Sequence, residues 1–389
     1  MNYNFLQSLT VPRPVGSANN QELQERLAKI GRGFGCQVEE IPFDCFTWQY
    51  GPSWLKTEKE RLEILPSPFS SSIKGEGELL FISTLQELRE AALAGKIVVL
   101  HGTIAAEPLM PKDFPFYEMP EHKEIVQLLE TGKPLAILSG MGKHPMCGLD
   151  PCSMFEDCHF TIPSAFFPAA QLSLFKQHKY GSIYIVSEAI PATGTQLVLR
   201  KPAKASVGKV ILCGHMDTAY NTSGALDNAV GLFVTLAVLE RLAETSLDFD
   251  LEVVPFNGED YAEVSGERAY LAAHPVKAEE IRLVINIDDA GHQGSQNALS
   301  LYNIPQHWES LVERLISADP LICRGEEWYA SDHSMFAAQG VPCLVFASSD
   351  LMTETTRLTH TPQDTLEEVD FALVENMVDT ICGLLWSLC

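Results

Sequence analysis

From residue 208 onward, short apolar strands alternate with helices, and this alternation restricts the fold more than any other feature of the sequence. The expected strands span residues 209–213, 251–255, 283–287 and 342–347, and the expected helices span residues 228–242, 266–273, 308–316 and 369–386. This order predicts an α/β fold, a three-layer sandwich whose central sheet is mostly parallel and carries helices on both faces.

The region before residue 208 has a different pattern of strands, helices and loops. An amphipathic helix at residues 19–34, closed by glycines, and a strand at residues 37–43 are expected to belong to the sandwich. Residues 65–187 instead contain short apolar strands separated by Gly- and Pro-rich loops, with few long helices. We therefore expect a small β-rich domain at 65–187, inserted into a larger domain made of residues 1–64 and 188–389.

Charge and composition exclude several classes of function. The formal net charge of −24 argues against nucleic acid binding, because a phosphate backbone requires a cationic face. The N-terminus lacks the basic start and apolar core of a secretory signal, and no apolar run is long enough for a membrane span. The ten cysteines are interpreted as reduced thiols, and a cytoplasmic location is expected.

Acidic and imidazole side chains follow several of the predicted strands. Functional residues of open α/β sheets gather beyond the carboxyl ends of the strands, so these side chains are expected to share one crevice. The candidates are His215, Asp217, Asp227, Glu259, Asp260, Asp288, Asp289 and His360. A single residue of this kind is more often a cap or a satisfied polar group than a functional residue.

Together, these side chains predict a metal site. So many carboxylates in one crevice would repel one another and raise each other's pKa, and divalent cations remove that conflict. Imidazole and carboxylate ligands without a thiolate favour Zn, Mn, Co or Fe over Ca or Mg. Five ligands exceed the three of a mononuclear catalytic zinc but suit two metals that share a carboxylate, hold a hydroxide between them and polarise a carbonyl.

The motifs around these residues resemble those of the dizinc aminopeptidase family, which includes aminopeptidase Y, bacterial leucyl aminopeptidases, glutamate carboxypeptidase II and the glutaminyl cyclases. The matching runs, in the family's order, are HMDT with GALDNAVG, FNGEDYAEVSGERAYL, VINIDDAG, SDHSMFAAQGVP and THTPQDTLEEVD. The resemblance implies a phosphorylase/hydrolase-like sandwich. In the insertion, GKIVVLHG, KPLAILSG and TIPSAFFPAAQLSLF resemble a protease-associated domain, which shapes or covers the substrate cleft in some family members.

The resemblance also implies a role for each candidate in a site with two zinc ions per chain. His215 and Asp288 hold one metal, Asp260 and His360 hold the other, and Asp227 bridges the two. Asp217 hydrogen-bonds the His215 imidazole and fixes its tautomer. Glu259 is the general base, which takes a proton from the bridging water and passes it to the leaving amine.

Two positions depart from the family's pattern. Asp260 stands where the family mostly has the longer Glu, so the site either contracts around the shorter acid or binds one metal weakly. Thr359 precedes His360 where some members have a Tyr that stabilises the oxyanion. Neither departure removes the general base, so we expect an active enzyme.

The function expected from the resemblance is metal-dependent hydrolysis of a terminal peptide bond in a peptide substrate, with aminopeptidase activity favoured. Carboxypeptidase action and glutaminyl cyclisation on the same set of ligands stay open as alternatives, and cyclisation typically needs only one zinc. A non-catalytic homologue that serves as a binding or scaffold protein is a further alternative. Homo-oligomerisation through the insertion is also left open.

Two other clusters are interpreted as ordinary structure. The loop containing His144, Cys147, Cys152, Cys158 and His159 matches none of the usual spacings of a structural zinc site, so we expect loop thiols. The run Ser331-Asp332-His333 lacks a nucleophile elbow, and triad members are normally far apart in sequence. Asp332 and His333 are therefore expected to support the cleft wall or to bind the end group of the substrate.

Overall fold

The structure, a computed structural model, describes residues 1–389 except 113, 115–118, 145–146, 262 and 388–389. It divides into two compact units, one made of Met1–Asp44 and Thr193–Cys389 and the other of Cys45–Ala192. Two long strands, β1 (Gln37–Lys56) and β7 (Tyr180–Lys201), contribute residues to both units. The insertion expected at residues 65–187 lies within the second unit, and its assignment as a protease-associated domain stays a prediction.

The first unit is built on a mostly parallel sheet with the strand order β7-β9-β8-β10-β13-β11-β12. The new strands are β8 (Lys209–His215), β9 (Asp250–Phe256), β10 (Ile281–Ile287), β11 (Asn297–Tyr302), β12 (Ile322–Arg324) and β13 (Cys343–Ser348). β8 runs parallel to both β9 and β10, and β10 runs parallel to β13. β7 and β11 are antiparallel to β9 and β13. The sheet order therefore places the ends of four parallel strands side by side.

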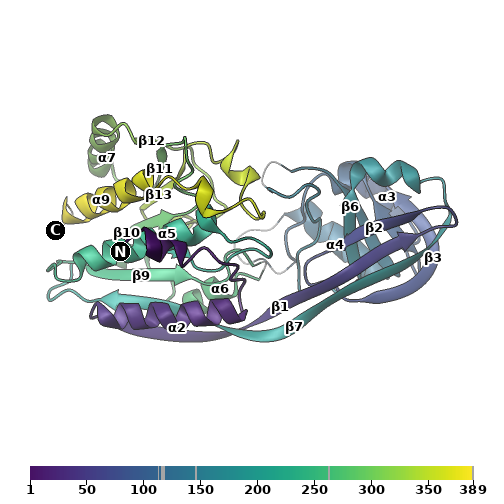
Figure 1. Cartoon of the computed structure of the whole chain (residues 1–389), viewed down its shortest axis with the longest axis horizontal. Coiled ribbons are helices and arrows are strands. Elements are labelled where there is room, and N and C mark those ends of the chain that lie inside the picture. Colours follow the sequence, from purple (N-terminus) through teal and green to yellow (C-terminus); the bar gives the residue numbers. More distant parts are fainter. Residues whose placement is uncertain (113, 115–118, 145–146, 262, 388–389) are drawn as a thin grey trace. The chain divides into compact units, whose positions relative to one another are not determined.

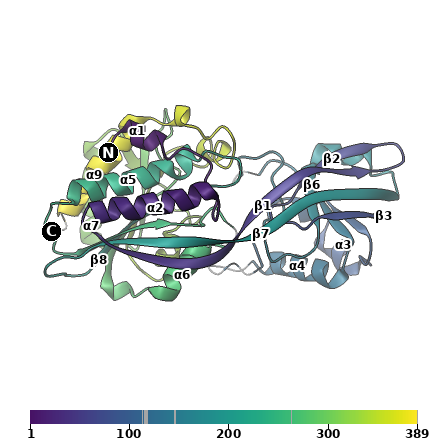
Figure 2. The same cartoon turned by 60° about the horizontal axis from the view of Figure 1, so that its bottom comes forward.

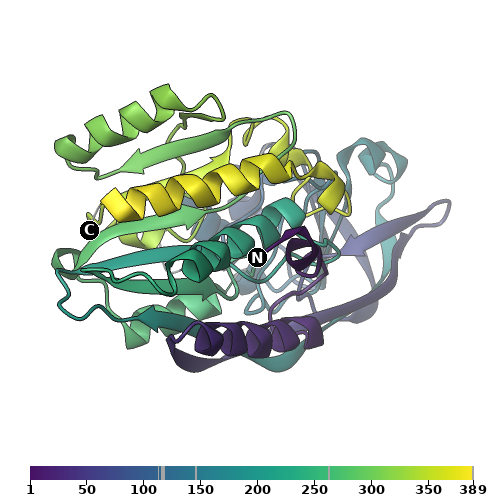
Figure 3. The ribbon, with the colours of Figure 1, turned by 60° about the vertical axis from the view of Figure 1, so that its left-hand side comes forward.

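Helices cover both faces of this sheet, which confirms the predicted α/β sandwich. They are α1 (Tyr3–Gln7), α2 (Ala18–Gly33), α5 (Val230–Leu242), α6 (Ser265–Ala273), α7 (Gln306–Ala318), α8 (Ser334–Ala337) and α9 (Phe371–Ser387). In Figures 1 and 3, α5 and α9 lie side by side along the sheet. Gly35, with a φ of 78°, follows the end of α2 in the left-handed conformation that favours glycine there.

Alternation along the strands supplies a core for each face. Leu212 of β8 and Leu232 of α5 share one hydrophobic cluster with α2 and α9. On the opposite face, the ring of Tyr270 in α6 packs edge-to-face against Phe256 of β9, at a centroid distance of 5.3 Å. Tyr270 also packs against Phe336 of α8. The two cores hold the sheet, and with it the strand ends, in a fixed position.

The second unit contains a ring of strands in the order β1-β2-β6-β5-β4-β3-β7, which closes because β1 also pairs with β7. The new elements are β2 (Arg61–Pro66), β3 (Ile73–Ile82), α3 (Leu85–Glu90), β4 (Ile97–Leu100), α4 (Pro120–Gly132), β5 (Ala136–Met141) and β6 (Ser164–Pro168). Figure 2 shows β1 and β7 running beside each other. The unit is rich in strands, and its helix α4 has 13 residues and was not predicted from the sequence.

Two further expectations concern the described residues. The nine cysteines among them are all free thiols. None of the helices in the described part of the chain combines the length and the apolar character that crossing a membrane requires.

We predict that Leu212→Ala destabilises the first unit by about 2–5 kcal/mol, because it leaves a cavity in the buried centre of the sheet. Val207→Ala, at a side chain that is 62% exposed, is the matched control and should change the free energy of unfolding by less than about 0.5 kcal/mol. Urea unfolding followed by circular dichroism measures both variants. Equal stability of the two variants would contradict the assigned core.

Candidate metal centre

The candidate side chains come from five segments that meet at one edge of the first unit's sheet. His215 is the last residue of β8, and Asp288 directly follows β10. Asp260 comes four residues after the end of β9, and His360 lies in the segment between β13 and α9. Asp227 lies in an irregular turn before α5, where its φ of −124° and ψ of 83° are not helical. The structure thus brings all five predicted ligands together.

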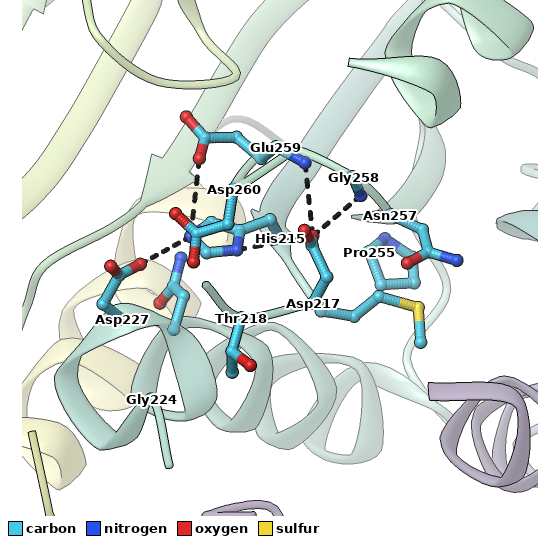
Figure 4. A network of polar contacts seen from close by, with 12 residues as sticks. His215, Asp217, Thr218, Gly224, Asp227, Pro255, Asn257, Gly258, Glu259 and Asp260 are labelled. Atoms are coloured by element: carbon cyan, nitrogen blue, oxygen red, sulfur yellow. Dashed lines mark hydrogen bonds and ion pairs between the residues drawn. The ribbon is translucent and has the colours of Figure 1, made fainter. Parts of the chain in front are cut away.

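Asp227 occupies the centre of the cluster and faces both imidazoles. Its Oδ1 lies 2.9 Å from the Nε2 of His215, and its Oδ2 lies 3.0 Å from the Nε2 of His360. Asp288 Oδ1 lies 3.3 Å from the His215 nitrogen, and Asp260 Oδ1 lies 2.8 Å from the His360 nitrogen. The side chains therefore form two groups, each with one imidazole and one carboxylate of its own, joined by Asp227. Figure 4 shows His215 between Asp227 and Glu259.

The carboxylates of the cluster favour the positively charged form of both imidazoles. Burial alone lowers the pKa of His215, but the neighbouring carboxylates, Asp288 first, outweigh burial and raise the pKa well above its ordinary value. The His360 side chain is 42% exposed; its partial desolvation lowers the pKa, but the carboxylates, chiefly Asp260, outweigh this and raise the pKa well above its ordinary value. The pKa of Asp227 is lowered, because the two imidazoles outweigh the burial that would raise it. Without another cation, protons would have to supply this charge.

Divalent cations fit the same positions. The His215 side chain is fully buried, and neither of its ring nitrogens makes a hydrogen bond in the described structure. Ligand atoms bound tetrahedrally at 2.0–2.2 Å from a zinc ion lie about 3.3 Å apart. The separations of 2.8 to 3.3 Å within each group are close to that value. Imidazole and carboxylate donors are also the ligand types that Zn, Co and Mn accept.

Asp217 contacts the turn that follows β9. Its Oδ1 accepts hydrogen bonds from the backbone N–H groups of Gly258 at 2.8 Å and Glu259 at 3.2 Å, as Figure 4 shows. The same oxygen lies 3.6 Å from the Nδ1 of His215, which is longer than a normal hydrogen bond. Asp217 thus positions the turn that carries Glu259, and its hydrogen bond to the His215 imidazole stays a prediction.

Glu259 extends beside the cluster without joining either group. Its Oε2 lies 3.9 Å from the Nε2 of His215, and its side chain is 20% exposed. Burial raises the pKa of Glu259 well above its usual range; His215 opposes this shift, and Asp288 adds to it. A carboxyl group with a raised pKa, next to the cluster and open to solvent, is suited to accept and return a proton.

The shorter acid at position 260 still reaches its group. Asp260 Oδ1 faces His360, while its Oδ2 accepts a hydrogen bond of 2.8 Å from the backbone N–H of Ala219. The second oxygen of Asp260 is thus used to hold the neighbouring loop. One oxygen of Asp260 is left to face a cation.

Several polar residues around the cluster were not assigned from the sequence. Asp364 accepts hydrogen bonds from the backbone N–H groups of Ala225, Leu226 and Asp227, and burial together with Asp227 raises its pKa to about 7. Glu267 is 1% exposed, and burial raises its pKa to about 8. Asp364 lies within the THTPQD motif, but the motif does not reveal that its partners are backbone amides.

Asp289, at the end of β10, was noted in the sequence but given no role. Its side chain lies close enough to Asp227 and Asp288 to form an acidic group with them. Burial and the charges of Asp227 and Asp288 raise its pKa well above the ordinary value. The cluster therefore contains more carboxylate than the five predicted ligands supply.

Ser331 contacts the cluster, whereas His333 is bonded elsewhere, so the two do not form a triad. The hydroxyl of Ser331 donates a 2.5 Å hydrogen bond to Asp288 Oδ2. His333 Nε2 bonds the carbonyl oxygen of Trp328 at 2.9 Å, and burial lowers the pKa of this imidazole to about 4. The neutral imidazole is thus a satisfied core group. Asp332 is buried, which raises its pKa well above the usual value.

The fold and the cluster together define a metallopeptidase-like α/β protein, and known proteins are similar to it in sequence and in fold. Residues 197–385 match the model of peptidase family M28, in agreement with the family resemblance of the motifs in this region. A curated relative from Caenorhabditis elegans, "Putative endoplasmic reticulum metallopeptidase 1-A", is 32% identical over 105 residues. That match covers 26% of this chain and only 12% of the relative's length.

Solved structures show the same fold over almost the whole chain. An aminopeptidase from Aneurinibacillus sp. strain AM-1 has a TM-score of 0.77 and 20% identity, covering 99% of this chain and 92% of that one. BSAP, a zinc aminopeptidase from Bacillus subtilis, has a TM-score of 0.74 and 18% identity, covering 99% and 94%. A glutaminyl cyclase from Porphyromonas gingivalis has a TM-score of 0.52 and 14% identity, covering 100% and 97%. At these identities the similarity establishes the fold.

The arrangement predicts how many divalent cations each variant binds. Asp260→Ala should leave one strong site, because His215, Asp227 and Asp288 stay together, whereas Asp227→Ala should weaken both sites because each uses one of its oxygens. Equilibrium dialysis with elemental analysis measures the bound metal. Asp379→Ala, at a side chain that is 67% exposed, is the control and should bind as the unaltered protein does. If Asp227→Ala lost only one of the two ions, this result would contradict the proposal that both sites share Asp227.

Proposed function

We propose that this chain is a zinc-dependent aminopeptidase that binds two ions and hydrolyses the N-terminal peptide bond of its substrate. The observation that carries the proposal is the position of Asp227, whose two oxygens face two different imidazoles at 2.9 and 3.0 Å. A carboxylate shared between two groups of ligands suits a pair of cations. The match to peptidase family M28 and the fold shared with a zinc aminopeptidase support the same function.

Each ion would have its own imidazole and carboxylate. His215 and Asp288 would hold the first ion, His360 and Asp260 the second, and Asp227 would bridge them. When bound, such ions polarise the carbonyl of the scissile bond and lower the pKa of water. Ser331 would fix the orientation of Asp288 through its hydrogen bond to the other oxygen of that carboxylate.

Glu259 moves the proton in this proposal. Its carboxylate accepts a proton from the attacking water and then donates it to the nitrogen of the leaving amine, so that the C–N bond breaks without expelling an amide anion. Asp217 keeps this side chain in place because it holds the backbone N–H groups of Gly258 and Glu259. The Glu259 Oε2 lies 3.9 Å from the Nε2 of His215, which is farther than the ligand-type oxygens of Asp227 and Asp288.

Glu259→Gln should lower kcat by about 10²- to 10⁴-fold, because the amide cannot accept the proton, and should leave the metal content unchanged. Hydrolysis of an aminoacyl p-nitroanilide and elemental analysis measure the two quantities. Glu309→Gln, an exposed position at the start of α7, is the control and should retain full activity. Unchanged turnover in Glu259→Gln would overturn the mechanism.

The end of the substrate that is recognised can be tested directly. An aminopeptidase should cleave a peptide with a free N-terminus. It should lose this cleavage when the N-terminal amine is acetylated, because an aminopeptidase requires the free amine. A carboxypeptidase would still cleave the acetylated peptide at its free C-terminus. Mass spectrometry of both products decides between the two readings.

Glutaminyl cyclisation is a second candidate, favoured by the fold shared with a glutaminyl cyclase. A peptide that begins with Gln distinguishes it from hydrolysis. Cyclisation of the N-terminal Gln releases ammonia and closes a ring without shortening the peptide. An aminopeptidase instead removes the whole residue. Loss of ammonia without peptide shortening would overturn the aminopeptidase proposal.

A further inference from the structure

Arg13 is a fully buried cation that contacts the loop between His215 and Asp227, and it makes no hydrogen bond to a carboxylate among the described contacts. Its guanidinium instead donates to five backbone carbonyl oxygens at 2.7 to 3.2 Å. The acceptors are Leu9, Val11, Met216, Ser223 and Gly224. Three of these carbonyls belong to the loop that leads from His215 to Asp227.

The bonds to this loop fall at its two ends. Arg13 Nε donates to Met216 O, next to His215, at 2.7 Å. Its Nη1 and Nη2 donate to the carbonyls of Ser223 and Gly224, just before the turn of Asp227, at 3.0 and 3.2 Å. One rigid, planar group therefore sets the separation between the two ends of the loop.

Asp364 completes the contact from the other side of the same turn. Its Oδ1 accepts from the N–H groups of Ala225 at 3.0 Å and Leu226 at 2.7 Å, and its Oδ2 accepts from Asp227 N–H at 3.2 Å. The Arg13 guanidinium thus donates to the carbonyl oxygens of residues 223 and 224, and the Asp364 carboxylate accepts from the amides of residues 225–227. These bonds restrain the peptide groups of the turn from both the carbonyl and the amide side.

The turn is also sterically closed. Gly224 has a φ of 56°, and a Cβ atom there would lie 2.4 Å from both the Asp227 carbonyl oxygen and Thr218 Cγ2. Thr218 itself accepts a 3.0 Å hydrogen bond from the backbone N–H of Arg13. The segment of Arg13, the loop and the turn are therefore packed as one body.

We infer that Arg13 and Asp364 are positioning residues that aim the two oxygens of Asp227 at the two groups of ligands. The positive charge of Arg13 also attracts Asp217, Asp227 and Asp260, so it offsets part of the repulsion among the carboxylates before any ion is bound. Both side chains act through the backbone groups that they bond, and neither belongs to the proposed ligand set. This inference rests on the proposed two-ion site.

The test is a titration of the metal-free protein with Co(II), followed by visible absorption and by calorimetry. Arg13→Met should weaken Co(II) binding by about 10- to 100-fold and should change the absorption bands, because the shared carboxylate is no longer held. Arg13→Lys keeps the charge and some of the bonds, so it should restore part of the affinity. These readouts do not require turnover.

Arg200→Met is the matched control. Arg200 is a half-buried arginine of the same unit that pairs with Glu39 and Glu252, outside the proposed centre. Its loss should lower the free energy of unfolding while leaving the Co(II) affinity and spectrum unchanged. A variant of Arg13 that is merely destabilised would behave in the same way as this control, and that result would overturn the inference.

Asp364→Asn keeps the test decisive if Arg13→Met does not fold. The amide retains one oxygen for Ala225 and Leu226 but cannot accept from Asp227 N–H, so we expect weaker Co(II) binding with altered bands. Wild-type Co(II) affinity and absorption bands in Asp364→Asn, or in a folded Arg13→Met, would overturn the inference and leave the two-ion proposal in place. Failure of the unaltered protein to bind Co(II) would overturn the two-ion proposal and the inference with it.

Discussion

The site depends on one shared carboxylate, Asp227, which interacts with two imidazoles at once. If its two oxygens turned away, His215 with Asp288 and His360 with Asp260 would be separate pairs instead of one cluster. Side chains alone do not fix such a position, because an Asp has two freely rotating bonds. The surrounding backbone must be held first, and here buried charges of both signs hold it. The chemistry of the cluster is thus built on a network of backbone hydrogen bonds.

The parallel sheet explains why this network is sufficient. β8, β9 and β10 are parallel neighbours, so their carboxyl ends bring His215, the Glu259 turn and Asp288 to the same edge without long loops. Only two elements need separate support: the turn of Asp227 and the segment of His360. Asp364, four residues after His360, bonds the turn directly, so the two less regular elements support each other.

The sequence predicted what depends on local pattern and missed what depends on tertiary contacts. Buried strands such as β8 and β10 are continuous apolar runs, and the motif around His215 and Asp227 is dense enough to identify. β12 has only three residues and α4 lies among Gly- and Pro-rich loops, so neither has a clear periodic signal. Arg13 is a lone cation in a Pro-rich segment, and nothing local shows that it is buried against carbonyls. The roles of the five predicted ligands stay proposals, although their proximity is now described.

The division of the chain has a consequence for the order in which its contacts can form. The second unit is continuous, residues 45–192, whereas the first combines both ends of the chain. During synthesis from the N-terminus, the ring of strands can therefore close before the larger sheet has its later strands. Arg13 and α2 are made first, yet Met216, Ser223 and Asp364 are made only after the whole second unit. The contacts of Arg13 therefore cannot form until these residues have been synthesised. They close a long loop, which costs conformational entropy and slows folding.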